Sequence, residues 1–284
     1  MNLHFQRFPA PAKLNLTLLI TGKRTDGYHL LDSDFRFIDF GDDIDIAVRD
    51  DGCIVLETPT PGVEPESDLT VRAARLLQQA SGSRLGASLR VTKRIPMGGG
   101  LGGGSSDAAT VLLALNKLWG CGLSRQQLMT LGVQLGADVP VFIFGRNARA
   151  RGIGEQLEAI DLPAAWYVVC KPPVSVPTGP VFQLFSQKLL TGEVRFSIMR
   201  SLFDATQKQN DLQSVVTAMY PAVNEALNRL NEYGSPLMTG SGACVFLELE
   251  SEDQAKSVFQ SLSKDMVGFV AKGLATHPLY DGEA

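Results

Sequence analysis

PMGGGLGGGSSDAA, at residues 96–109, is the stretch that decides the fold of this chain. Six of the seven residues from 98 to 104 are glycine, and the helix-like run SSDAATVLLALNKLW follows. Glycine loses much backbone entropy on folding, so such a row indicates a loop whose backbone must approach a ligand closely. Free N–H groups at a helix start, with Ser105 or Ser106 as the expected cap, favour a bound anion. The stretch therefore predicts a phosphate-binding loop.

Other interpretations of the loop are weaker. A flexible linker is disfavoured because the run lies between a strand and an amphipathic helix. A Walker A loop requires G-x-x-x-x-G-K-[ST], which does not occur in the sequence. Gly98, Gly100 and Gly103 match the dinucleotide fingerprint G-x-G-x-x-G, but the next acid after Asp107 is Asp138, too distant to bind a ribose. A nicotinamide-dependent oxidoreductase is therefore kept as the alternative of lower weight.

Outward from the loop, strand-like and helix-like patterns alternate along the chain. In AKLNLTLLI, residues 12–20, apolar and polar side chains alternate, which predicts a strand with one face in the core. Ser251 with Gln254 indicates a capping box for a late helix. We expect strands at 12–20, 34–40, 44–48, 88–95, 141–144, 148–154, 166–170, 243–249 and 267–271, and helices at 68–80 (capped by Ser67), 105–119, 124–136, 211–220, 221–234 and after 251.

The order of these elements indicates an α+β fold in two domains. A chain of 284 residues is long enough for two packed cores, and we place the division near residue 160, giving domains 1–160 and 161–284. The proline-rich segment KPPVSVPTGP, residues 171–180, is expected to be a linker or a substrate loop.

Composition narrows the class of protein further. Hydrophobic residues make up 44% and charged residues 20%, which is typical of a globular chain. A net charge of −4 argues against a nucleic-acid binder and favours small-molecule substrates. The four cysteines form no C-x-x-C pair, and we find neither a signal peptide nor a run of about 18 apolar residues. We expect a soluble, cytoplasmic protein that makes no membrane contact.

Three segments together resemble the GHMP kinases, which include galactokinase and the homoserine and mevalonate kinases. They are PAKLNLTLLITGKRTDGYHLL from residue 11, the glycine stretch, and LMTGSGACVF from residue 237. The resemblance extends from about Pro11 to Pro278. It implies an N-terminal domain of the ribosomal protein S5 domain 2-like type and a C-terminal ferredoxin-like domain.

A narrower resemblance within the superfamily is carried by AKLNL, DGYH, LGADVPVF and VSVPT. It points to the kinases of a cytidine diphosphate-linked acceptor. The implied reaction is phosphorylation by ATP of the 2-hydroxyl of 4-diphosphocytidyl-2-C-methyl-D-erythritol, in isoprenoid precursor biosynthesis by the non-mevalonate pathway. A noncatalytic, nucleotide-binding relative is a further alternative, although it would not need to keep the catalytic pair.

That catalytic pair, by resemblance, is Lys13 and Asp138. Asp138 would accept the proton of the acceptor hydroxyl, and Lys13 would keep Asp138 ionised and stabilise the transferring phosphoryl group. Without the resemblance, Asp138 is equally an ordinary turn residue and Lys13 a solvated lysine on a strand face. Spacing does not show that they meet, because 125 positions separate them.

The resemblance also implies the residues that bind the nucleotide and its Mg²⁺. Mg²⁺ is expected to arrive with ATP and to bridge the β- and γ-phosphates, since no protein metal cage is visible. Asp107 sits close to the phosphates and could contact either them or the metal. Lys93 could reach the nucleotide or be a surface lysine. The expected nucleotide-binding residues are Lys93, Pro96, Met97, Gly98, Gly99, Gly100, Leu101, Gly102, Gly103, Gly104, Ser105 and Ser106.

For the acceptor, the resemblance assigns a second set of residues. Tyr28 could stack on a cytosine ring, His29 could hydrogen-bond its edge, and Phe182 could close the other side. A buried tyrosine, a surface histidine and a plain turn at 239–242 are the alternatives. The expected acceptor-binding residues are Asn15, Tyr28, His29, Thr178, Phe182, Thr239 and Gly240. We expect a monomer or a weak homodimer.

Overall fold

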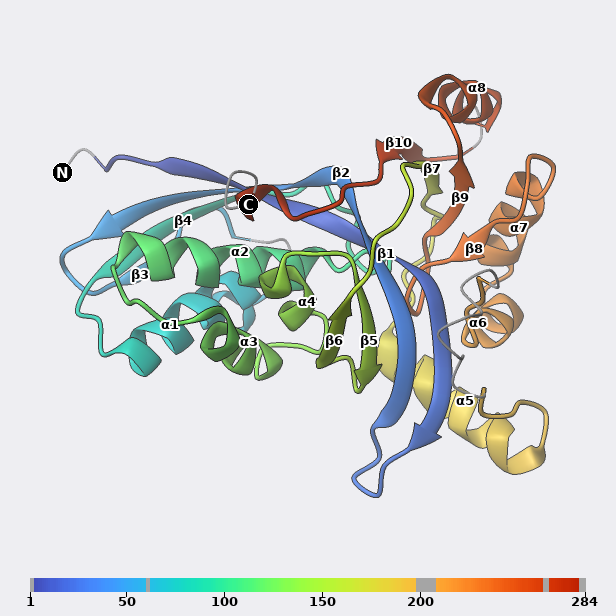
Figure 1. Cartoon of the computed structure of the whole chain (residues 1–284), viewed down its shortest axis with the longest axis horizontal. Helices are drawn as coiled ribbons and strands as arrows, with labels where there is room; N and C mark the ends of the chain where they lie inside the picture. Colours follow the sequence, from blue (N-terminus) through green and yellow to red (C-terminus); the bar gives the residue numbers. More distant parts are fainter. Residues whose placement is uncertain (1–2, 60–61, 198–207, 263–265, 281–284) are drawn as a thin grey trace.

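The computed structural model describes residues 3–59, 62–197, 208–262 and 266–280 and contains two sheets, with helices packed against each (Figure 1). The strands are β1 (Gln6–Lys23), β2 (His29–Arg49), β3 (Ile54–Leu56), β4 (Gly86–Thr92), β5 (Ala148–Gly152), β6 (Gln156–Ala159), β7 (Trp166–Cys170), β8 (Leu237–Met238), β9 (Val245–Leu249) and β10 (Gly268–Lys272). The helices are α1 (Leu69–Ser81), α2 (Gly103–Leu118), α3 (Arg125–Val133), α4 (Val139–Phe144), α5 (Thr178–Thr191), α6 (Gln213–Met219), α7 (Pro221–Leu230) and α8 (Glu252–Leu262), with short 3-10 turns at Pro65–Ser67 and Pro278–Tyr280.

The larger sheet is built around a long antiparallel hairpin of β1 and β2. Its order is β3-β4-β2-β5-β6, with β1 paired to β2. The register of β1 on β2 shifts three times, first between Pro11 and Ala12 opposite Gly41. A Cβ on Gly41 would lie 2.4 Å from the Ala10 carbonyl oxygen, so only glycine permits this crossing of the strands. The bulges bend the hairpin, and Figure 1 shows it running from the larger sheet down beside α5.

The smaller sheet has the strand order β10-β7-β9-β8, and all of its pairs are antiparallel. Numbered within this half of the chain, that order is 4-1-3-2. Helices α5 to α7 connect the first two strands and α8 connects the last two, which is the β-α-β-β-α-β arrangement of a ferredoxin-like domain. The C-terminal fold implied by the resemblance is therefore confirmed.

Several elements differ from the sequence-based expectation. The strands expected at 34–40 and 44–48 are one strand, β2, because residues 41–43 keep pairing with β1 through the bulge. The strand expected at 141–144 is wrong: these residues form α4, since a short buried apolar run has no period that separates strand from helix. Helix α5 and the short strands β3, β6 and β8 were not expected, and the last residues of the proline-rich segment, 178–180, form the first turn of α5.

The helix ends also show where cap predictions fail. Helix α1 is capped by Asp68, which accepts from the Thr70 amide, and not by Ser67. Helix α2 begins at Gly103, so the two expected cap serines lie inside its first turn and Gly102 takes the cap position. The Ser251 hydroxyl does accept from the Gln254 amide, as expected. Within the described ranges, no helix is long and apolar enough to cross a membrane.

Candidate active site

The polar face of β1 is buried, which corrects the expectation that only its apolar face lies in the core. Lys13 is 2% exposed and Asn15 is 3% exposed. The Lys13 ammonium donates to Asn15 Oδ1 at 2.5 Å, and Asn15 Nδ2 donates to Ser33 Oγ on β2 at 2.8 Å. The apolar face is covered at the same time by the smaller sheet, through residues such as Tyr167. A solvated lysine on a strand face is therefore excluded.

Lys13 meets the aspartate that lies 125 positions away. Its ammonium is 3.2 Å from Asp138 Oδ2 and 5.3 Å from the centre of the Phe35 ring. Asp138 precedes α4 and makes no side-chain cap bond to that helix, so its carboxylate is free to face Lys13. The aspartate side chain is 35% exposed and opens toward a cavity, whereas the lysine side chain is 3% exposed. A buried cation next to an accessible carboxylate suits proton and phosphoryl transfer.

The glycine loop is held from both sides by backbone hydrogen bonds. The Lys13 amide donates to Leu101 O at 3.0 Å from the β1 side. From the C-terminal half, the amides of Ala243 and Cys244 donate to Gly98 O at 3.2 Å and Gly99 O at 3.1 Å. These bonds fix the loop against two segments that are more than 200 residues apart, which excludes a flexible linker.

Two glycines in the loop have no substitute. Gly100 and Gly102 have φ of +75° and +74°, which other residues rarely adopt. A Cβ on Gly100 would lie 2.2 Å from Thr239 O, and one on Gly102 would lie 3.0 Å from Phe142 Cζ and 3.1 Å from Lys13 Cε. The close packing of the loop against Lys13 therefore depends on the missing side chains.

Two cavities share the glycine loop as a wall. One, of about 350 Å³, is lined by every residue from Pro96 to Gly104, by Lys93, and by the turn before α1. The other, of about 710 Å³, is lined by Lys13, Asn15 and Asp138 and by residues of both halves of the chain. Gly100 and Gly102 line both. Molecules in the two cavities could thus meet across the loop, beside the Lys13–Asp138 pair.

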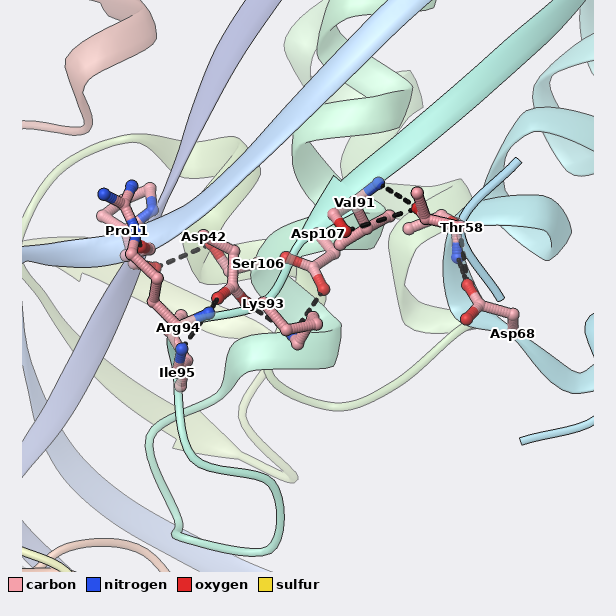
Figure 2. Close-up of polar contacts among 12 residues, drawn as sticks. Pro11, Asp42, Thr58, Asp68, Val91, Lys93, Arg94, Ile95, Ser106 and Asp107 are labelled. Atoms are coloured by element: carbon pink, nitrogen blue, oxygen red, sulfur yellow. Dashed lines mark hydrogen bonds and ion pairs between the residues drawn. The ribbon is translucent and has the colours of Figure 1, made fainter. Parts of the chain in front are cut away.

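Lys93 lies in the smaller cavity but is already paired, as Figure 2 shows. Its ammonium contacts Asp42 Oδ2 and lies 2.7 Å from Asp107 Oδ2. Asp42 is fully buried on β2 and also accepts from the amides of Arg94 at 2.5 Å and Ile95 at 2.7 Å. The cluster joins β2, the end of β4 and α2 at the base of the loop.

The electrostatics of this cluster follow from burial and shared charge. Burial, and more weakly the nearby Asp42, raises the pKa of Asp107 to about 7 against the pull of Lys93. Burial lowers the pKa of Lys93, but the two carboxylates raise it more, so its net shift is upward. Asp107 Oδ1 is buried and has no hydrogen-bond partner in the described part of the chain. Among those residues, no group of three or more His, Cys, Asp or Glu could hold a metal.

The two loop serines have different environments. Ser106 Oγ donates to Pro11 O at 2.7 Å and is fully buried, which makes it part of the helix–strand contact (Figure 2). Ser105 lines the larger cavity near Asp138. Of the residues expected at the nucleotide, Ser105 and Ser106 are thus the two that do not line the smaller cavity.

The residues expected to bind the acceptor lie around the larger cavity. The His29 ring packs on Phe182 with centroids 5.0 Å apart and tilted by 34°, and its Nε2 lies 3.0 Å from Ser186 Oγ. Burial, with a smaller effect of Lys23, lowers the pKa of His29, which favours the neutral form of the ring. Tyr28 is 61% exposed at the cavity edge, so a buried tyrosine is excluded.

The loop at 239–242 is more than a plain turn. Thr239 is buried, and its hydroxyl accepts from the Asn15 amide at 3.0 Å and donates to Gly100 O at 3.2 Å. The adjoining Gly240 lines the larger cavity, as does Thr178, whose hydroxyl lies 2.8 Å from Ser241 Oγ. Thr239 does not line the larger cavity itself; it supports the cavity wall by its hydrogen bonds to Asn15 of β1 and to Gly100 of the glycine loop.

Sequence reasoning missed other wall residues. Ser33 and Phe35 reach the larger cavity from β2, and Ile153 and Gly154 reach it from the turn after β5. The turn before α1 lines the smaller cavity through Val63, Ser67 and Asp68, and the first turn of α1 lines it through Leu69 and Thr70. None of these residues belongs to a motif, because the pairing of the strands and the path of the chain into α1 bring them to the cavities.

Comparison with known proteins agrees with this geometry. Family models match at residues 68–146, described as the GHMP kinases N terminal domain, and at residues 196–268, described as GHMP kinases C terminal. Solved homoserine and mevalonate kinases share the fold at 15% identity, with TM-scores of 0.67 and 0.68. These two structures support the fold alone.

Closer relatives cover nearly the whole chain. A 4-diphosphocytidyl-2-C-methyl-D-erythritol kinase of Chromobacterium violaceum is 65% identical over 277 residues, 98% of each protein. One of Thiobacillus denitrificans is 54% identical over 97% of this chain and 98% of the relative. A crystal structure named 4-(cytidine 5'-diphospho)-2C-methyl-D-erythritol kinase has a TM-score of 0.77 at 32% identity and covers 94% of this chain and 99% of its own. The chain belongs to the GHMP kinases and, within them, to the 4-diphosphocytidyl-2-C-methyl-D-erythritol kinases.

Proposed function

We propose that this enzyme transfers the γ-phosphoryl group of ATP to the 2-hydroxyl of 4-diphosphocytidyl-2-C-methyl-D-erythritol, giving the 2-phosphate and ADP. The observation that carries the proposal is the Lys13–Asp138 pair at 3.2 Å, beside a glycine loop that two cavities share. The names of the relatives supply the acceptor. The route belongs to isoprenoid precursor biosynthesis by the non-mevalonate pathway.

In the reaction, the acceptor oxygen forms a bond to the γ-phosphorus while the bond from that phosphorus to the β-phosphate oxygen breaks. The hydroxyl proton passes to Asp138, which faces the larger cavity. Lys13, buried and paired with Asn15 and Asp138, orients the carboxylate and stabilises negative charge on the transferring group. Because phosphoryl transfer is mainly positioning and charge stabilisation, this rigid pair is suited to it.

The phosphates of ATP would bind to the backbone of the loop at the start of α2. The αL conformation of Gly98, Gly100 and Gly102 and the absence of side chains leave N–H groups accessible, and the helix dipole favours negative charge there. Pro96, Met97 and Lys93 would border the rest of the nucleotide in the smaller cavity. Ser106 would support the loop from behind through its bond to Pro11.

The cytosine of the acceptor would bind between the exposed Tyr28 and the His29–Phe182 pair. A neutral imidazole can both donate and accept hydrogen bonds, which suits the polar edge of the base. Flat aromatic rings offer stacking for its face. Thr178 and Gly240 would border the same cavity on the side of the C-terminal half.

Mg²⁺ would bind mainly through the nucleotide phosphates. The side chains present fit such a metal and not an all-protein cage, since the described residues lack a ligand cluster and Asp107 Oδ1 is a single partnerless carboxylate oxygen. Asp107 would face the metal or a water that the metal carries. Bound Mg²⁺ supplies charge neutralisation at the β- and γ-phosphates.

The two alternatives from the sequence have no support. A dinucleotide-binding loop follows a strand of a parallel sheet, whereas β4, which leads into this loop, pairs antiparallel with β2 and parallel only with the short β3. A noncatalytic relative would not need the close Lys13–Asp138 pair. We also propose a domain division near residue 160, a cytoplasmic location and a monomer or weak homodimer, which limited proteolysis, fractionation and light scattering would test.

The test of the function is direct turnover. Purified protein with ATP, Mg²⁺ and 4-diphosphocytidyl-2-C-methyl-D-erythritol should release ADP, and phosphorus NMR should show one new phosphomonoester on the acceptor. Mevalonate and homoserine serve as controls and should give ADP release at the background ATPase level. Turnover of either control without turnover of the cytidyl acceptor would refute the substrate assignment.

A further inference from the structure

The C-terminal residues Gly273–Tyr280 lie on the opposite half of the molecule from the strand that precedes them. Figure 1 shows this segment leaving β10 and running back along β2 over the larger sheet. The Leu274 amide donates to Phe37 O at 2.8 Å, and Asn147 Nδ2 donates to Leu274 O at 2.8 Å. We call residues 273–280 the C-terminal brace.

The brace ends on the C-terminal end of α4. The Tyr280 hydroxyl donates to Ile143 O at 2.6 Å, and the His277 amide donates to Gly145 O at 2.9 Å. The last carbonyls of a helix have no partner within it, so these bonds supply what α4 cannot. A Cβ on Gly145 would lie 2.3 Å from two carbons of the Tyr280 ring, which shows how closely the ring covers this end.

Helix α4 needs such support because it has only six residues. A helix of that length is not stable alone, and its position is set by what packs on it. Asp138 precedes its first residue without a side-chain cap bond, so the position of the carboxylate depends on where the helix lies. A shift at the Tyr280 end of this short element is transmitted to the Asp138 end.

A second path leads from the brace to the catalytic pair through stacked rings. The His277 ring meets Phe37 edge-on with centroids 5.9 Å apart, and Phe37 stacks on Phe142 of α4 at 5.5 Å. Phe142 in turn packs on Gly102 of the glycine loop, where the nearest side chain besides it is Lys13. The brace therefore contacts the helix that directly follows Asp138 and, through Phe37 and Phe142, is linked to the residues packed around Lys13.

We propose that the C-terminal brace is a positioning element for phosphoryl transfer, with Tyr280 and His277 as positioning residues that hold Asp138 at reacting distance from Lys13. The proposal rests on the proposed function for its kinetic readout. It requires that loosening the brace lowers kcat and leaves the KM for ATP unchanged, because the nucleotide cavity has no residue of the brace or of α4 among its walls.

The test compares Tyr280→Phe, which removes one hydrogen bond, with Tyr280→Ala, which also removes the ring. The control is Tyr233→Phe, at a half-exposed tyrosine that lines neither site cavity. We expect kcat to fall about threefold in Tyr280→Phe and on the order of a hundredfold in Tyr280→Ala, with the KM for ATP within twofold, since a displacement near 1 Å is enough for such a loss. Tyr233→Phe should match the wild type.

Hydrogen exchange supplies a readout that does not depend on turnover. Amides of Val139 and of residues 141–145 should exchange faster in both Tyr280 variants, while those of α2 keep wild-type rates. The proposal is overturned if both variants keep kcat within twofold, if KM for ATP rises as much as kcat falls, or if the unfolded fraction accounts for the loss. Absent turnover in the wild type would refute the function, and the exchange of α4 would still decide whether the brace holds it.

Discussion

Replacing Asp138 with asparagine tests the catalytic pair most directly. The substitution keeps the shape of the side chain and removes its charge and basicity, 3.2 Å from the Lys13 ammonium. A positioned general base contributes roughly 10²–10⁴ in rate. We therefore expect kcat to fall by that factor, which corresponds to about 3–5 kcal/mol of activation free energy.

The affinity for ATP should change little in the same variant. Asp138 lines the larger cavity and not the smaller one, so its loss removes no wall of the nucleotide site. Lys13 keeps its hydrogen bond to Asn15 Oδ1 and its place over the Phe35 ring, so its ammonium is not left without contacts. We expect the dissociation constant of ATP to stay within about twofold, because no more than a few tenths of a kcal/mol is involved.

The assay pairs coupled ADP release, for kcat and KM, with calorimetric titration of a nonhydrolysable ATP analogue. Asp161→Asn is the control, because that aspartate also pairs with a basic side chain, that of Arg146 at 3.3 Å, but its own side chain is 99% exposed and outside both cavities. A variant at Asp138 that binds ATP tenfold more weakly and keeps kcat would refute the role of this residue as a base.

Three further changes test the loop, the ion cluster and the brace. Gly102→Val should weaken ATP binding at least tenfold and displace Lys13. The control is Gly120→Val, at a similar φ of +65° with open space around it, which should keep wild-type affinity. Equal affinities of the two variants for ATP in a calorimetric titration would contradict the packing argument. The free energy of unfolding of Asp107→Asn should rise relative to that of the wild type as pH rises from 5 to 8. The reason is that the pKa of Asp107 is about 7 in the folded state and about 4 in the unfolded state, so the wild type loses stability as pH rises from about 4 to 7. A difference in urea unfolding that does not change with pH would count against this. Burial lowers the pKa of His277 to about 3, so the free energy of unfolding of the wild type should fall by up to about 1.4 kcal/mol per pH unit as pH falls from about 6.5 toward 3. His277→Asn should flatten this pH dependence. Stabilities of the variant and the wild type that change in parallel with pH would exclude the effect.

The parts of the fold with a strong period were predictable from the sequence. The strands at β1, β7 and β10 and the helices α1, α2 and α7 follow apolar spacing that packing only reinforces. Helix α4 was not predictable, since VPVFIF is apolar at every position and its helical state depends on the brace and on Phe37. The continuity of β2 also escaped prediction, because Gly41-Asp42-Asp43 reads as a turn unless the bulge opposite is known.

Site residues that belong to a motif within one segment were predictable from the sequence. Those that the fold brings together from distant segments were not. The glycine content of the loop is enough to predict that its backbone approaches a ligand closely. The meeting of Lys13 with Asp138 came from resemblance, because no local pattern relates positions 125 residues apart. Asp42 carried no signal at all: its role arises from a bulge that turns a strand aspartate inward, under Lys93.

Because the amides of Ala243 and Cys244 hold the glycine loop, the N-terminal half of this enzyme is not expected to keep the loop in place on its own. A fragment that ends near residue 160 would keep the whole phosphate motif and yet expose the carbonyls of Gly98 and Gly99 to water. Six glycines without that second set of partners would sample many conformations, few of them able to receive a triphosphate. Under the proposed function, the affinity for ATP therefore depends on both halves of the chain, and an isolated N-terminal half should bind ATP more weakly than the full chain although it keeps every residue of the motif.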